Sequence, residues 1–428
     1  MSEIALKLNK DLENTQAGFL LSQLGKRLFF PRGIVAQAAE ASEKANVYNA
    51  TAGMAFDSGN PLISSAMRNM INGMEPDEYI TYAPTPGLKP LRELWLEEIK
   101  KKNPTLGNAH TSLPIVVPGL TSGISNCADL FLDKDDNIVL PDLYWGNYSL
   151  IMNVRKEVNI KTFTFFKDNR INSEGLKQTL IDSAKNGKVT LLLNFPNNPT
   201  GYSPTISEAE EIKNAVLEVA KQNIKILVIS DDAYFGLFYE EDIFKESMFA
   251  HFANLHENIL AAKIDGATKE DYSWGLRVGF ITFAGRGLTK IHTDALENKL
   301  MGSVRSSFSS SSKLSQALIL RSLKSDSYSD EKIKFDEIMR LRYLKVKEIL
   351  EKRTTGLALK EYPFNSGYFM NFKTEPGFNE KLRLALLEVG IGTISLDTSS
   401  LRVAYSCIDI DKLEDLYSNI FKVADTLQ

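Results

Sequence analysis

The sequence predicts an α/β protein built on a mostly parallel sheet, followed by a smaller α+β domain. From residue 114 onward, short apolar runs alternate with helix-like segments. The runs at 189–194 and 224–230 are continuously apolar, as is typical of strands that helices cover on both faces. Beyond residue 313 the order changes to a long helix-like stretch followed by strand-like runs, which indicates the smaller domain.

The individual elements follow from local patterns along the chain. The first 45 residues are expected to be helical and amphipathic in parts, with Leu20, Leu21, Leu24 and Leu28 on one side and a break at Pro31. Strands are expected at 114–117, 137–141, 160–166, 189–194, 224–230, 258–264, 276–283, 364–372 and 400–406. Helices are expected at 61–72, in a segment that begins near 89, in one that ends near 132 and in one that begins after 145. Further helices are expected at 173–182, 207–221, 313–353 with a break near 325–330, 379–389 and 410–427.

Composition excludes several classes of function. The 428 residues are 43% hydrophobic, enough for two domains with sizeable cores. The net charge of −4 gives no basic field for nucleic acid or an anionic membrane. Two cysteines, Cys127 and Cys407, and four histidines predict neither a disulfide framework nor a metal site. Without a signal-like or membrane-length apolar run, a cytoplasmic protein is expected.

The segment at 267–279 carries the most informative motif, because Lys269 is followed by Gly275, Arg277 and Gly279. The lysine comes just after an apolar run, and the arginine opens the next strand-like run. An amine held among apolar walls beside another cation loses proton affinity. Such an amine can form a Schiff base, which is how proteins attach pyridoxal phosphate (PLP). Taken alone, Lys269 could equally be a surface lysine at a strand end.

Other polar motifs follow predicted strands, where ligands of parallel sheets bind. The glycine turn at 119–123 could offer free amides to an anion, although most such turns bind nothing. Trp145 could stack on a flat ring or fill the core. Asn198 lies in the loop NFPNNPTG, and a plain Asn-Pro turn explains its conformation but not its place after a buried strand.

Asp231 and Asp232 come directly after the most apolar strand of the chain. A buried carboxylate is costly unless it is paired, and the protonated ring nitrogen of PLP would be such a partner. Tyr234 could donate to the phenolic oxygen of the same cofactor. Helix capping by the aspartates is the alternative, but a separate explanation would then be needed at each of the four strand ends.

Seven segments together carry a resemblance to a known family: YNATAGMA, YAPTPGLKPLREL, YWGNY, NNPTG, DDAY, K-x5-G-x-R-x-G and SLRVAYS. From about residue 48 to its C-terminus, the chain resembles the class I aminotransferases of PLP fold type I, in particular the aspartate and aromatic group. The resemblance implies a large domain with a mostly parallel seven-stranded sheet and a smaller α+β domain. The expected divisions are an N-terminal segment at 1–52 that joins the small domain, a large PLP-binding domain at 53–320 and a small domain at 321–428.

The resemblance also implies roles for the residues at the strand ends. Lys269 would hold PLP as an aldimine and then act as general base and acid. Asp231 would pair with the ring nitrogen, Asn198 and Tyr234 would hydrogen-bond the ring oxygen, and Trp145 would stack on the ring. The expected phosphate contacts are Gly119, Leu120, Thr121 and Arg277. The expected substrate contacts are Arg402 for the α-carboxylate, Gly53, Asn198, Trp145 and Arg305. Arg402 could otherwise form a surface ion pair, and Gly53 could be an ordinary turn residue.

Two of the expected site residues would come from a second subunit, so a homodimer is expected. Tyr82 resembles the loop tyrosine that reaches the phosphate of the neighbouring subunit. Arg305 stands where aspartate-specific members bind a distal carboxylate, although a structural role in its loop is an equal alternative. The chain departs from the family pattern at Gly266, where relatives often carry a phosphate-binding serine, and Thr268 or Ser309 could compensate.

The expected function is transfer of an amino group between an L-amino acid, with aspartate first and an aromatic donor second, and a 2-oxo acid such as 2-oxoglutarate. A PLP-dependent lyase or amino-acid decarboxylase would use the same cofactor residues and is the alternative. A PLP-sensing regulator is a further rival, but the chain has no basic patch and little room before residue 48 for a DNA-binding module.

Overall fold

A computed structural model describes the chain except for residues 14, 16–20, 30–32, 357–358, 398 and 428. Leu20 and Pro31, which take part in the predicted N-terminal helix and its break, lie outside the described residues. The helices described in this region are α1 (Glu3–Asp11), α3 (Gln23–Arg27) and α4 (Ile34–Lys44). The described part of the first 45 residues is therefore helical in separate short pieces.

The centre of the molecule is a seven-stranded sheet, which confirms the predicted fold class. Its strand order is β4 (Ile115–Val117), β12 (Gly279–Gly285), β11 (Ile259–Asp265), β10 (Lys225–Asp231), β9 (Lys188–Asn194), β5 (Asn137–Pro141) and β6 (Asn159–Phe163). The five strands from β11 to β6 run parallel, and only β12 is antiparallel to its neighbours. The carboxyl ends of β9, β10 and β11 therefore meet at one edge.

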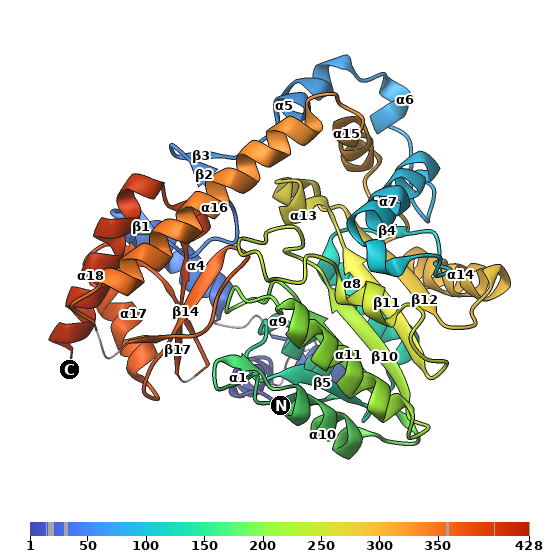
Figure 1. Cartoon of the computed structure of the whole chain (residues 1–428), viewed down its shortest axis with the longest axis horizontal. Helices are drawn as coiled ribbons and strands as arrows, with labels where there is room; N and C mark the ends of the chain where they lie inside the picture. The colour runs from blue at the N-terminus through green and yellow to red at the C-terminus, as the bar shows by residue number, and fades with distance from the viewer. Residues whose placement is uncertain (14, 16–20, 30–32, 357–358, 398, 428) are drawn as a thin grey trace.

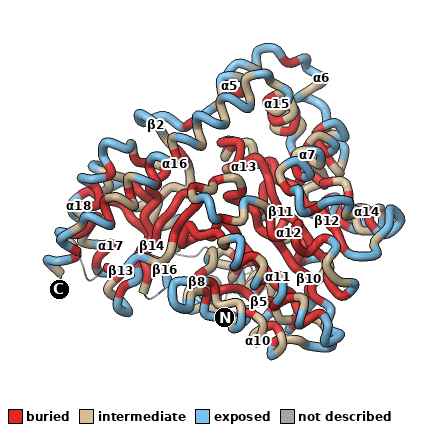
Figure 2. The backbone as a smooth tube through the Cα atoms, in the orientation of Figure 1, coloured by how far each residue is buried: buried red, intermediate tan, exposed pale blue. Residues whose placement is uncertain are grey.

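The apolar runs form central strands because both of their faces are covered. Ile138 and Leu140 of β5 pack into one hydrophobic cluster, whereas Val139 between them packs into another. Helices α10 (Ser173–Ser183) and α11 (Ile206–Ala220) lie over one face, and α8 (Leu120–Phe131) lies over the other (Figure 1). Figure 2 shows these central strands buried along most of their length.

A second sheet of four strands belongs to the C-terminal part of the chain. Its order is β13 (Lys360–Glu361), β14 (Phe369–Lys373), β17 (Ser400–Ala404) and β16 (Ile394–Leu396), all antiparallel. Helices α17 (Phe378–Glu388) and α18 (Leu413–Thr426) pack beside it. The long helix α16 (Tyr328–Lys352) runs across to the region of α5 (Ser65–Met70) and α15 (Lys313–Leu323) (Figure 1). The predicted domain boundaries after residues 52 and 320 stay a prediction.

The N-terminal segment is attached to this second unit. Strand β1 (Tyr48–Asn49) pairs in parallel with β15 (Ile391–Gly392). The side chain of Gln37 in α4 exchanges two hydrogen bonds with the backbone of Ser395, at 2.8 and 2.9 Å. The remaining elements are β2 (Phe56–Asp57), β3 (Asn60–Pro61), α5 (Ser65–Met70), α6 (Pro76–Tyr79), α7 (Lys89–Lys102), β7 (Phe166–Lys167), β8 (Arg170–Ile171), α9 (Asn147–Ser149), α12 (Met248–Phe252), α13 (Ala267–Glu270), α14 (Lys290–Ser307) and α15 (Lys313–Leu323), with short 3₁₀ or π turns between some of them.

Two strand predictions were too long. The run at 160–166 ends as a sheet strand at Phe163, because the amide of Phe165 bonds the side chain of Asp142 and residues 166–167 pair with β8 instead. The run at 364–372 becomes a strand only at Phe369. The backbone amides of Asn365 and Ser366 both bond the carbonyl of Gly201, each at 2.9 Å, so this stretch lies against the NNPTG loop.

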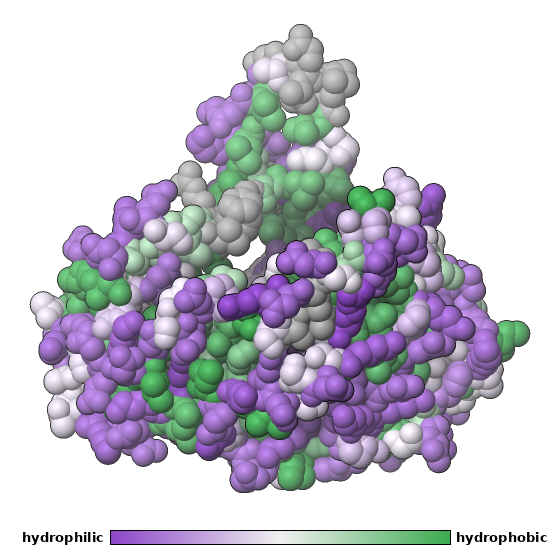
Figure 3. All heavy atoms as spheres, turned by 90° about the horizontal axis from the view of Figure 1, so that it is seen from above, coloured by the Kyte–Doolittle hydropathy of each residue, from purple (hydrophilic) through white to green (hydrophobic). Residues whose placement is uncertain are grey.

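Among the described residues, no helix combines the length and apolar character needed to cross a bilayer. The face of the molecule seen from above is mostly hydrophilic, with hydrophobic side chains in smaller groups (Figure 3).

Candidate active site

A cavity lies at the sheet edge where β9 and β10 end. Asn194 and Asp231 are the last residues of these two strands and are paired in register, so both reach the edge at the same level. The turn after β11 adds Thr268 and Lys269. The residues that line the cavity are Leu120, Thr121, Trp145, Tyr148, Asn194, Asn198, Asp231, Ala233, Tyr234, Thr268, Lys269 and Arg277. Residues from five separate predicted motifs are therefore brought to one place.

Lys269 lies in α13, four residues beyond the end of β11, as a partly buried side chain that lines the cavity. Burial lowers the pKa of Lys269 to about 8; the nearby charge of Arg277 lowers it too, whereas Asp231 opposes the fall. The Nζ atom lies 4.8 Å from the ring centroid of Tyr234. At pH 7 about a tenth of this amine is therefore neutral and nucleophilic, a far larger share than for a lysine with its ordinary pKa.

Asp231 provides a buried carboxylate on the cavity wall. Burial raises the pKa of its carboxyl group, while a hydrogen bond from the Tyr148 hydroxyl and the charge of Lys269 act in the opposite direction. The amide of Ala233 donates to its Oδ1 at 3.2 Å. The side chain of Asn194 donates to its backbone carbonyl at 2.8 Å. The carboxylate is thus fixed in direction, and among the described residues no cation bonds it directly.

The start of α8 forms an anion site beside these groups. Gly119 precedes the helix with φ +84°, and a Cβ at this position would lie 2.3 Å from Nη2 of Arg277. The guanidinium therefore lies against the glycine, next to the free amides of the first helical turn. The hydroxyl of Thr268, which lines the same cavity, is buried without a hydrogen-bond partner among the described residues.

Arg402 approaches the cavity from β17 of the second sheet. It is 2% exposed, and its guanidinium donates to Oδ1 of Asn198 at 3.0 Å and to the carbonyl of Thr51 at 3.1 Å. Its Cζ lies 4.2 Å from the ring centroid of Phe369. Burial lowers the pKa of Arg402 to about 10. Because both partners are neutral, the positive charge remains available to an anionic ligand.

The donor set fits PLP. The helix start, Arg277 and the unpartnered hydroxyl of Thr268 suit a phosphate, since all three present hydrogen-bond donors. Asp231 suits a protonated ring nitrogen, and the amine of Lys269 suits an aldehyde. Gly53 lies near the same space, because a Cβ there would be 3.4 Å from the hydroxyl of Tyr234.

The structure places two predicted site residues outside the cavity of their own chain. Tyr82 is 94% exposed. Arg305, at the end of α14, is exposed and donates to the hydroxyl of Ser309 at 2.5 Å. Neither of them lines the cavity. Arg277, expected to open the next strand, instead stands two residues before β12 with a left-handed φ of +55°.

Besides the apolar Ala233, two polar cavity residues were missed by the sequence analysis. Tyr148 follows Trp145 by three positions, so a helical start would place both on one face, but an aromatic residue in a helix looks like core. Asn194 was treated as the last residue of an apolar run. Its carboxamide accepts from the amide of Asn198 at 2.8 Å and holds the NNPTG loop against the end of β10.

The departure at Gly266 has a steric cause. A Cβ added there would lie 2.5 Å from the carbonyl oxygen of Val278 and 2.8 Å from Cα of Gly279. A serine at this position would therefore force the start of β12 to move. The buried hydroxyl of Thr268, two residues further on, is the donor that remains for a phosphate.

A cofactor-free protein bearing Lys269→Met is expected to be more stable than the parent at neutral pH. A fall in pKa from 10.5 to about 8 corresponds to about 3 kcal/mol of unfavourable charge burial. Because the pKa of this amine is lower in the folded than in the unfolded protein, the full destabilisation of the parent is present below pH 8. It falls between pH 8 and 10.5 and is absent above pH 10.5. Urea unfolding of both proteins between pH 7 and 11 measures the difference, and a constant difference across this range would contradict the assignment.

Comparison with known proteins gives one consistent picture. The family model described as "Aminotransferase class I and II" matches residues 51–420. The aspartate aminotransferase of Bacillus sp. (strain YM-2) is 26% identical over 53% of this chain and 53% of its own length. The aspartate/prephenate aminotransferase of Thermus thermophilus is 25% identical over 79% of this chain and 80% of its own. The chain thus matches about half the length of the first relative and most of the second.

Solved structures show the same fold. An aminotransferase from Anaerococcus prevotii superposes with a TM-score of 0.83 at 23% identity, covering 94% of this chain and 98% of that one. The Thermus thermophilus aspartate aminotransferase with maleate superposes with a TM-score of 0.72 at 20% identity, covering 94% and 99%.

Proposed function

Because the chain belongs to the class I and II aminotransferases, a PLP-dependent family, we propose that it transfers an amino group between an L-amino acid and a 2-oxo acid. Aspartate or an aromatic amino acid is the proposed donor, and 2-oxoglutarate is the proposed acceptor. The names of the relatives, aspartate and aspartate/prephenate aminotransferase, support this choice. They do not favour the lyase or decarboxylase alternative.

The observation that carries the proposal is the shared cavity of a low-pKa amine, a buried carboxylate and an anion site. When bound, PLP supplies a positively charged conjugated ring that stabilises negative charge at the substrate Cα. Lys269 would hold the cofactor. Its Nζ would be the base that accepts the proton from the substrate Cα and the acid that returns it.

Neighbouring residues would hold the charges that this proton transfer needs. Asp231 would keep the proton on the ring nitrogen, and Tyr148 would keep the carboxylate pointing at it. Asn198 and Tyr234 would hydrogen-bond the ring oxygen, while Trp145 would cover one face of the ring.

Binding and orientation would come from the two ends of the cavity. Gly119, Leu120, Thr121 and Arg277 would hold the phosphate, together with the hydroxyl of Thr268. Arg402 would pair with the substrate α-carboxylate, for which a planar guanidinium offers two parallel hydrogen bonds. Gly53 would leave room for the substrate beside Tyr234.

A homodimer is part of the proposal. The side chain of Tyr82 is almost fully exposed, so it is free to reach a second subunit, and the exposed Arg305 does not line the active-site cavity of its own chain. Each would complete the site of the partner, Tyr82 at the phosphate and Arg305 at the distal carboxylate of a dicarboxylic substrate. The cytoplasmic location stays a prediction.

The donor preference can be tested with purified holoenzyme, 2-oxoglutarate and a panel of L-amino acids. Glutamate formation with aspartate or an aromatic donor is expected to exceed that with aliphatic donors. With aspartate alone, oxaloacetate in an amount equal to the enzyme sites indicates transamination, whereas continued release of alanine would identify a β-decarboxylase.

Arg305→Ala is expected to reduce kcat/KM for aspartate by about 10²-fold, because a distal carboxylate would lose its charged partner. The same substitution should leave kcat/KM for phenylalanine or tyrosine within about threefold of the parent value. Steady-state kinetics with both donor classes provide the measurement, and Ser309→Ala, which removes the hydroxyl to which Arg305 donates, is the matched control. Equal losses for both classes would mean that Arg305 is structural.

A further inference from the structure

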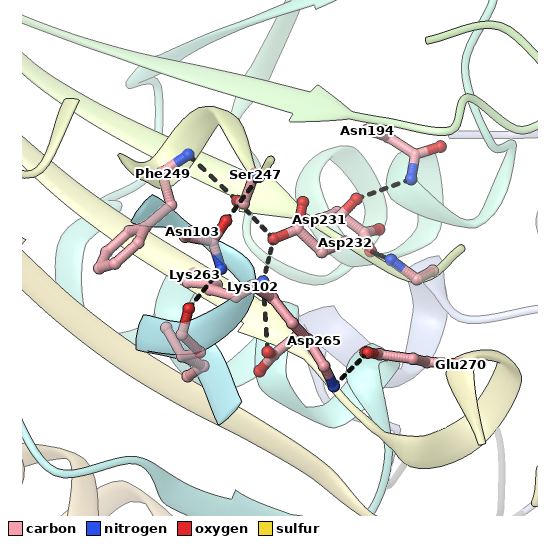
Figure 4. A network of polar contacts seen from close by, with 12 residues as sticks. Lys102, Asn103, Asn194, Asp231, Asp232, Ser247, Phe249, Lys263, Asp265 and Glu270 are labelled. Atoms are coloured by element: carbon pink, nitrogen blue, oxygen red, sulfur yellow. Dashed lines mark hydrogen bonds and ion pairs between the residues drawn. The ribbon is translucent and has the colours of Figure 1, made fainter. Parts of the chain in front are cut away.

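A second lysine, Lys263, lies completely buried behind the cavity and takes no part in the proposed chemistry. It is 1% exposed and belongs to β11. Its ammonium pairs with Oδ2 of Asp232 and lies 3.2 Å from Oδ2 of Asp265 (Figure 4). The same ammonium lies 4.7 Å from the ring centroid of Phe235. A cation and two carboxylates are therefore buried together within the sheet edge.

The ion pair lies directly behind Asp231. Asp231 and Asp232 are consecutive, and Asp231 lines the cavity, whereas Asp232 accepts from the hydroxyl of Ser247 at 2.6 Å on the other side. The backbone amide of Asp232 also donates to the carbonyl of Ile264 in β11, at 2.9 Å. Lys263 thus fixes Asp232, the residue next to Asp231, and through it the direction in which the Asp231 carboxylate points.

Lys263 also holds the strand that leads to Lys269. Its second partner, Asp265, is the last residue of β11, and only Gly266 separates it from α13. The indole of Trp95 in α7 donates to the same Asp265 oxygen at 3.1 Å. A single ammonium therefore joins the end of β10, which carries Asp231, to the end of β11, which leads to Lys269.

The charges in this cluster depend on Lys263. Burial lowers the pKa of Lys263, but Asp232 and Asp265 outweigh this effect and leave that pKa above its ordinary value. Burial raises the pKa of Asp231 and Asp232, and the charge of Lys263 acts against the rise in both. Glu270, which also faces the cluster, is paired with Lys102 at 2.6 Å.

We propose that Lys263 is a positioning residue that, through Asp232 and Asp265, fixes the placement of Asp231 and Lys269 and keeps Asp231 negatively charged. The inference rests on the proposed function, because it concerns the two residues assigned to the cofactor. Lys263 does not touch the cavity, so its effect reaches the cofactor only through these neighbours.

The test is a double-mutant cycle on the holoenzyme. Lys263→Met removes a positive charge but keeps an unbranched stem, and Asp232→Asn removes the negative charge opposite it. The readout is the pH midpoint of the visible absorbance of bound PLP, which reports the charge around Lys269. Lys263→Met is expected to raise this midpoint and Asp232→Asn to lower it, each by about one pH unit, because like charges near the amine favour deprotonation.

The double variant is expected to return towards the parent midpoint, since the pair is removed without leaving an unpaired charge. Arg383→Met is the matched control, because Arg383 is a buried cation between Glu40 and Glu380 in the C-terminal unit. This control should lose stability in urea unfolding but keep the parent midpoint and the parent kcat.

Midpoints unchanged from the parent in both single variants, with stability lost as in Arg383→Met, would overturn the proposal and leave Lys263 with a structural role only. If Lys263→Met does not fold, Asp232→Asn and the double variant still decide, because an unchanged midpoint in Asp232→Asn overturns it equally. Failure of the proposed function gives different results: without PLP binding the parent protein itself would show no borohydride-trapped PLP, and a lyase or decarboxylase would trap PLP but form no glutamate from 2-oxoglutarate.

Discussion

Replacement of Lys269 by alanine is expected to reduce kcat for transamination by about 10⁴-fold or more, because it removes the group that would move the substrate proton. The amine has the burial and the pKa near 8 that this role requires. Borohydride treatment followed by mass spectrometry should add the mass of PLP to the parent chain at residue 269 and leave the variant unmodified.

Lys102→Ala provides a control for this experiment, since it removes another amine close to the same turn without touching the cavity. It should lose stability yet retain the trapped PLP. A Lys269→Ala protein that still yields a trapped adduct at full stoichiometry would show that a different amine holds the cofactor.

Replacement of Arg402 by alanine is expected to raise KM for every amino acid donor by about 10²-fold, with a smaller effect on kcat. A buried guanidinium whose protein partners are both neutral is a strong site for a carboxylate. Steady-state kinetics with aspartate and with phenylalanine measure the effect, which should be equal for the two donors because both carry the same α-carboxylate.

Arg402→Lys separates charge from geometry. It keeps a positive charge but loses the planar fork, so an intermediate rise in KM is expected. Borohydride treatment should still trap PLP on the chain in both variants. A KM that does not change in Arg402→Ala would remove this residue from substrate binding.

The sequence predicts the sheet and much of the cavity because the relevant signals are local. Continuous apolar runs mark β9 and β10, and the polar residue that ends each run, such as Asp231, must lie at the carboxyl edge. The loop around Asn198 and the turn around Lys269 follow the same rule. These residues come together because the order and direction of the strands bring the loops that carry them to one edge of the sheet.

The rest depends on contacts between segments far apart in sequence. Nothing local shows that Tyr148 bonds Asp231, or that residues 365–366 leave the strand pattern to bond Gly201. Lys263 lies within an apolar run, where its charge looks like an exception and its partners become visible only once β10 and β11 pair. The reach of Tyr82 and Arg305 to a second subunit likewise stays a prediction.

The close packing around Gly266 constrains how this sequence can evolve. A serine would collide with the carbonyl of Val278 unless the start of β12 shifted first. A change from glycine to serine at this position is therefore expected to need accompanying changes at the start of β12. Relatives that carry a serine at this position are therefore expected to differ from this chain at positions of β12 as well.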